Sequence, residues 1–99
     1  MRMKLSLSEM QSLEYALSGL LLNFIPDSYY HKLLIAIIQK LYIKIAKALV
    51  EHQRDYNITI DEITALAFSE LFDHYPFQPT EHSFNLMLKL SNNIKQQFA

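Results

Sequence analysis

The segment from Tyr29 to Arg54 constrains the fold of this chain more than any other stretch. It contains neither proline nor glycine, so a helix of about seven turns could run through it without interruption. Winding it at about 100° per residue gathers apolar side chains on one broad face. That expected core face consists of Tyr30, Leu34, Ile37, Ile38, Leu41, Tyr42, Ile45, Ala48 and Leu49. We therefore expect this helix to be the spine of the fold.

A second, mostly apolar line follows the same helix, roughly a quarter to a half turn away from the core face. Its members are Ile35, Gln39, Ile43, Ala46 and Val50. This spacing suits contact with another helix. Three companion helices of the same chain could cover the line, and this intramolecular alternative stays open. If they do not, the line is a candidate interface with a partner protein, most simply a second copy of this chain.

The small number of glycines and prolines favours helices over strands. One glycine and three prolines in 99 residues are too few for the many turns of a sandwich or barrel. A hydrophobic fraction of 51% is enough for a packed interior and differs from the composition of disordered chains. We expect residues 1–99 to form one all-α domain.

Helix boundaries can be placed from capping and breaking signals. Ser6 with Glu9, and Thr59 with Glu62, have the spacing of a capping box, and Pro26 disfavours helical geometry just before it. These signals predict a four-helix up-down bundle, organised around the long second helix. The expected helices span about 8–25, 28–54, 60–75 and 81–97.

The charged residues of the second helix allow a different function. Lys40, Lys44, Lys47 and Arg54 form a strip that could contact nucleic-acid phosphates. The alternative is an ordinary solvated face, partly paired with acidic residues of the third helix. A net charge of −1 provides no global attraction for nucleic acid or an acidic membrane. Nucleic-acid binding is therefore the second interpretation, and we expect no membrane partner.

The sequence lacks the motifs of common catalytic and metal sites. There is no cysteine, no phosphate-binding glycine-rich loop and no nucleophile elbow. An up-down bundle would collect His31, His74 and His82 at one pole, but the HExxH and paired ExxH motifs are missing. We therefore expect no enzymatic activity, no cofactor and no bound metal.

The most apolar window contains three lysines, at positions 40, 44 and 47, which would be costly at the centre of a bilayer. The first ten residues also lack an uninterrupted apolar run of signal-peptide length. We accordingly expect a cytoplasmic location. Together these features predict a non-enzymatic helical protein-interaction module, which forms a homodimer through its second helix.

Overall fold

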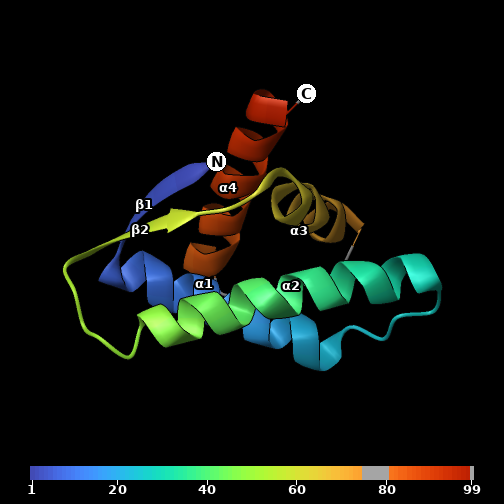
Figure 1. Cartoon of the computed structure of the whole chain (residues 1–99), viewed down its shortest axis with the longest axis horizontal. Coiled ribbons are helices and arrows are strands. Elements are labelled where there is room, and N and C mark those ends of the chain that lie inside the picture. Colours follow the sequence, from blue (N-terminus) through green and yellow to red (C-terminus); the bar gives the residue numbers. More distant parts are fainter. Residues whose placement is uncertain (75–80, 99) are drawn as a thin grey trace.

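The computed structural model describes residues 1–74 and 81–98. In these residues the chain forms four helices and two short strands (Figure 1). The elements follow one another as β1 (Arg2–Ser6), α1 (Leu7–Asn23), α2 (Tyr29–Ala48), β2 (Asp55–Thr59), α3 (Glu62–His74) and α4 (Glu81–Phe98).

The expected all-α four-helix bundle is wrong, because β1 and β2 pair as a two-stranded antiparallel sheet. The register places Met3 opposite Ile58 and Leu5 opposite Tyr56. These four side chains are buried while their neighbours along each strand face outward. This alternation with a period of two is what a sheet with one covered face requires. The fold therefore combines helices with a small sheet.

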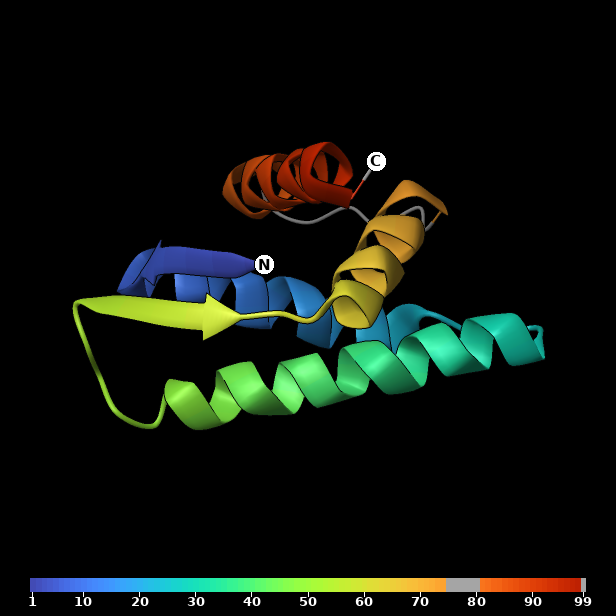
Figure 2. The same cartoon turned by 45° about the horizontal axis from the view of Figure 1, so that its top comes forward.

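Helix α1 is the central element, which corrects the expectation that α2 would be the spine. It contacts α2, α4 and both strands, whereas the main contacts of α2 are with α1 and α3. Figure 2 shows α1 and the sheet lying between α2 and α4. The predicted capping box starts α1: the Glu9 amide donates to the Ser6 hydroxyl at 3.2 Å, and the Ser6 amide donates to the Glu9 carboxylate at 3.0 Å. The residues that α1 buries are Met10, Leu13, Ala16, Leu17 and Leu20.

Helix α2 keeps most of its predicted core face but is shorter than expected. Its Ser28 cap accepts a hydrogen bond from the His31 amide at 3.2 Å. The helix ends at Ala48 instead of residue 54, so the last residues of the predicted helix belong to the connection to β2. Of the predicted core face, Tyr30 is half exposed. The fully buried residues are Leu34, Ile38, Leu41 and Ile45.

The hydroxyl of Tyr56 organises the connection between α2 and β2. It accepts a hydrogen bond from the Gln53 amide at 3.0 Å and donates one to the Glu51 carbonyl at 2.8 Å. The ring itself is buried in the core. The Tyr56 hydroxyl thus gives the Gln53 amide and the Glu51 carbonyl the hydrogen-bond partners that a longer helix would have given them. Helix α2 can therefore end at Ala48.

Helix α3 begins at a cap different from the predicted one. Thr59 belongs to β2, so the expected Thr59–Glu62 capping box does not form. Instead the Asp61 carboxylate accepts a hydrogen bond from the Thr64 amide at 2.7 Å. Hydrogen bonds from Thr64, with a smaller contribution from the Lys44 ammonium, hold the pKa of Asp61 below its usual value.

Small polar residues allow α3 and α4 to pack closely. The hydroxyls of Ser69 and Ser91 lie 3.4 Å apart and are buried. At the surface, the Lys95 ammonium reaches the Asp73 carboxylate at 3.0 Å. The predicted connector between the third and fourth helices, residues 75–80, lies outside the described residues.

The two bonds of the Tyr56 hydroxyl predict the effect of removing it. In Tyr56→Phe the ring still packs, but the Gln53 amide and the Glu51 carbonyl lose their partner. We expect the free energy of unfolding to fall by about 1–3 kcal/mol, measured by urea denaturation. Tyr15→Phe is the matched control, because Tyr15 is mostly exposed on α1. Equal stability of the two variants would contradict this role for the hydroxyl.

The lowered pKa of Asp61 predicts a pH-dependent contribution to stability. A carboxyl with a depressed folded-state pKa stabilises the fold fully above its unfolded pKa, near the ordinary value of 3.8, and loses that contribution as pH falls through the folded pKa. We expect Asp61→Asn to be less stable than the wild type at neutral pH, with the difference shrinking in acid below that value.

Urea denaturation of both proteins across this pH range measures the difference. Asp55→Asn makes the same change in net charge at an exposed position of β2 and serves as the control. A difference between wild type and Asp61→Asn that stays constant through the acid range would contradict the assignment.

Candidate functional site

The predicted interface line on α2 is not one continuous exposed surface. Ile35 packs against the hydrophobic core, and Ala46 is half buried. Gln39 and about half of Ile43 are exposed. Val50 is exposed as well, but it lies past the end of α2. The structure thus leaves an interrupted line, in which only part of the predicted apolar surface is open.

A larger apolar surface lies between the first half of α2 and helix α3. Tyr30 and Leu33 of α2 face Ile63 and Leu66 of α3 across a groove of about 380 Å³. These four side chains are 46–67% exposed, an unusual degree of exposure for neighbouring large apolar residues. The groove is completed by Leu34, Ile37, Ala67, Ser69 and Glu70. We call this surface the α2–α3 groove.

Helical spacing explains how the groove arises. Tyr30, Leu33 and Ile37 follow one another at intervals of three and four residues, which brings them to one side of α2. On α3, Ile63, Leu66 and residue 70 have the same spacing. The two rows border a common space because α2 and α3 pack against each other. Their core-facing neighbours close the floor.

One polar contact lies at the rim of the groove. The Tyr30 hydroxyl donates a hydrogen bond to the Glu70 carboxylate. Partial desolvation, followed by the negative charge of Glu70 and this hydrogen bond, raises the pKa of Tyr30. The phenol therefore stays protonated at neutral pH and acts as a donor across the groove.

The two helices that form the groove carry opposite charges. Helix α2 contains four lysines and no acidic residue. Helix α3 contains Glu62, Glu70 and Asp73 and neither lysine nor arginine. The groove thus runs between a basic helix and an acidic one, a pattern that favours partners with the complementary arrangement.

The predicted phosphate-binding strip is not a single helical face. Lys40 and Lys47 are exposed on α2, but the Lys44 ammonium donates to the Thr59 carbonyl at 2.6 Å and so ties α2 to the end of β2. Arg54 lies in the connection before β2, beyond the end of the helix. The structure therefore keeps the three lysines along α2 at helical spacing but places Arg54 beyond the end of the helix.

The histidine pole considered from the sequence is represented in the described residues by His31 alone. Its Nδ1 lies 2.7 Å from the Asp27 carboxylate, and its ring meets Phe24 edge-on at 5.5 Å between ring centroids. The side chains of His74 and His82 lie outside the described part. Within that part, no group of three or more His, Cys, Asp or Glu residues could hold a metal ion.

Sequence reasoning missed the α2–α3 groove because its two sides come from distant segments. A local signal did exist. Helix α3 carries apolar residues on both sides, with Ile63 and Leu66 exposed while Phe68 and Leu71 are buried. Like the second helix, α3 therefore has more apolar circumference than one core needs, and this excess is visible in its sequence.

No family model matches the chain, and the searches of curated proteins and of solved structures also found no match. Over residues 1–74 and 81–98, every helix is too short or too polar to cross a membrane. The groove therefore has to be interpreted from its own geometry and chemistry.

Proposed function

We propose that this protein is a non-enzymatic protein-interaction module that forms a homodimer through the α2–α3 groove. The observation that carries the proposal is the cluster of four exposed large apolar side chains from two packed helices. Contiguous apolar surface of this kind marks contact sites on proteins in water. We keep the prediction that the protein associates through its long helix. The proposed interface, however, is the α2–α3 groove and not the interrupted line on α2.

Charge complementarity favours a second copy as the occupant. In a two-fold symmetric dimer the same surface meets itself, so α2 of one copy can cross α3 of the other. Such a crossing brings the lysine-containing helix α2 of one copy beside α3 of the other, whose acidic residues are Glu62, Glu70 and Asp73. The basic and acidic sides of the groove thus complement each other in a dimer.

The amount of apolar surface suggests a weak dimer. Complete burial of a half-exposed Leu, Ile or Tyr side chain contributes roughly 1 kcal/mol to the free energy of dimer formation. Eight such side chains, four from each copy, contribute on the order of 8 kcal/mol, comparable with the cost of association of about 4–15 kcal/mol. Apolar burial then leaves a net binding free energy of about −4 kcal/mol at best, so we expect a Kd of about 1 mM or weaker.

Placing a charge in the groove should dissociate the dimer. Leu33→Lys would bury an ammonium against Ile63 and Leu66 of the groove, and we expect Kd to rise roughly tenfold or more. Leu22→Lys is the matched control, because Leu22 is 81% exposed on α1, outside the groove. Sedimentation equilibrium over a range of protein concentrations measures both variants, and circular dichroism checks that each stays folded.

Ile43→Lys separates the groove from the line predicted by sequence. Position 43 lies ten residues beyond Leu33 along α2, about 15 Å at the usual helical rise. Dissociation by Ile43→Lys but not by Leu33→Lys would move the interface back to the line. A wild-type protein that stays monomeric at millimolar concentration would overturn self-association altogether.

The alternative, binding of nucleic acid through Lys40, Lys44, Lys47 and Arg54, remains a prediction. No contact in the described residues favours it, and the bond from Lys44 to Thr59 occupies one of the four cations. Titration of DNA and RNA at several salt concentrations tests it, since phosphate contacts give a steep salt dependence. The expected cytoplasmic location is part of the proposal and is likewise a prediction.

A further inference from the structure

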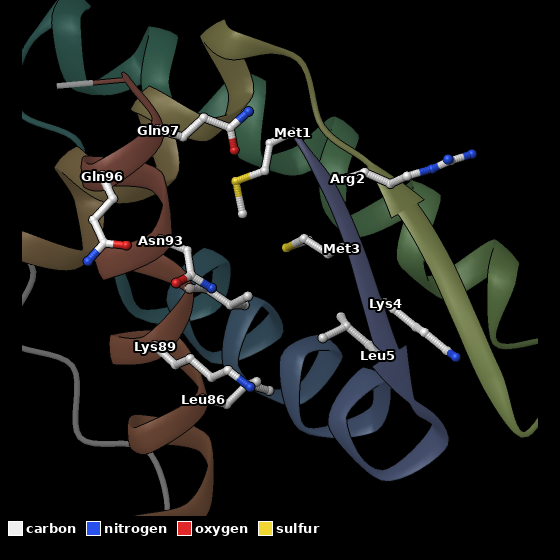
Figure 3. Close-up of a pocket in the computed structure, with 11 residues that line it drawn as sticks. Met1, Arg2, Met3, Lys4, Leu5, Leu86, Lys89, Asn93, Gln96 and Gln97 are labelled. Atoms are coloured by element: carbon white, nitrogen blue, oxygen red, sulfur yellow. The ribbon is translucent and has the colours of Figure 1, made fainter.

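A second groove lies between β1 and α4, away from the α2–α3 groove (Figure 3). It has a volume of about 470 Å³ and is lined by residues 1–5 and by one side of α4 between Leu86 and Gln97. In Figure 3, β1 lies between β2 and α4, so one edge of the strand borders this groove. We call it the β1–α4 groove.

The edge of β1 that faces the groove has open main-chain hydrogen-bonding groups. Met1 and Ile60 exchange both of their main-chain hydrogen bonds, each 2.7 Å long. Because paired residues of antiparallel strands alternate between bonded and non-bonded pairs, the peptide groups of Arg2 and Lys4 point away from β2. These groups have no main-chain partner among the described residues, so β1 can accept another strand.

The two walls of the groove match in length. The five residues of β1 extend about 17 Å at the rise of an antiparallel strand. The stretch of α4 from Leu86 to Gln97 extends about 17 Å at the helical rise. An extended segment of about five residues can therefore lie along the strand with α4 beside it, the geometry of peptide recognition by strand addition.

The charges around the groove select an acidic segment. Its lining includes Arg2, Lys4 and Lys89 and no aspartate or glutamate. Figure 3 shows Lys89 extending from α4 toward β1, while Arg2 and Lys4 extend to the opposite side of the strand. Acidic side chains at alternate positions of an added strand would lie beside Arg2 and Lys4, where opposite charges on neighbouring strands attract.

The same charges argue against a second copy of β1 as the occupant. Pairing β1 with β1 of another molecule would bring Arg2 and Lys4 of both copies together, and like charges on adjacent strands are destabilising. A basic edge strand therefore discourages self-pairing while leaving the edge open to a strand of opposite charge.

We propose that the β1–α4 groove binds an acidic peptide of another protein in extended conformation, as a third strand on β1. This goes beyond self-association, since it uses a different surface and a different partner. None of the residues that line the β1–α4 groove lines the α2–α3 groove. A variant that dissociates the dimer should therefore still bind the peptide.

A display library of random octapeptides, selected on the full-length protein, tests the proposal. We expect selected peptides to be enriched in Asp and Glu at alternate positions. Synthetic copies should shift the amide NMR signals of Arg2 and Lys4. They should also lose binding when the peptide nitrogens that face β1 are methylated, because methylation removes the donors of the strand pairing. Selection without acidic enrichment, or amide shifts confined to other parts of the chain, would overturn the proposal.

Charge reversal on β1 provides the matched comparison. We expect Lys4→Glu, at an exposed position of β1, to weaken binding of the acidic peptides roughly fivefold or more, since it replaces an attraction by a repulsion. Lys40→Glu makes the same change on α2, outside the groove, and should leave the affinity within about twofold. Fluorescence anisotropy measures both, with circular dichroism as the check on folding. Equal affinities for the two variants would contradict recognition by the β1–α4 groove.

Discussion

The pairing of β1 with β2 is the interaction on which the rest of the structure depends. It joins Arg2–Ser6 to Asp55–Thr59, so the chain must pass through α1 and α2 and return to the same place. The strands bury Met3, Leu5, Tyr56 and Ile58 against the core that α1 centres. The sheet thereby closes one end of the pair formed by α1 and α2, and the end of β2 determines where α3 begins.

The sheet also explains the shape of the helical part. The Tyr56 hydroxyl holds the connection before β2, and the Lys44 ammonium binds the carbonyl at the end of that strand. Helix α2 then extends past the region covered by α3, since it has 20 residues and α3 has 13. Where the two helices do run side by side, the outer apolar side chains of both remain exposed and border the α2–α3 groove.

The two grooves differ in the physical basis of recognition. The α2–α3 groove offers apolar side chains between a basic and an acidic helix, so burial of area provides the affinity and charge sets the orientation. The β1–α4 groove offers main-chain donors and acceptors beside cationic side chains, so strand pairing provides the contact and charge selects the partner. A small protein with both surfaces could hold a second copy and an acidic segment at the same time.

The sequence by itself determined the features that depend on residues three or four positions apart. The Ser6–Glu9 capping box and the buried row from Leu34 to Ile45 formed as their spacing predicted, because helical geometry makes such neighbours interact. Only the tertiary structure decided the β1–β2 pairing, the early end of α2 and the α2–α3 groove. The strand pairing joins residues 49 to 57 positions apart, and a five-residue strand has too short a pattern to specify its partner locally. The groove and the end of α2 depend in turn on where β2 and α3 lie against α2.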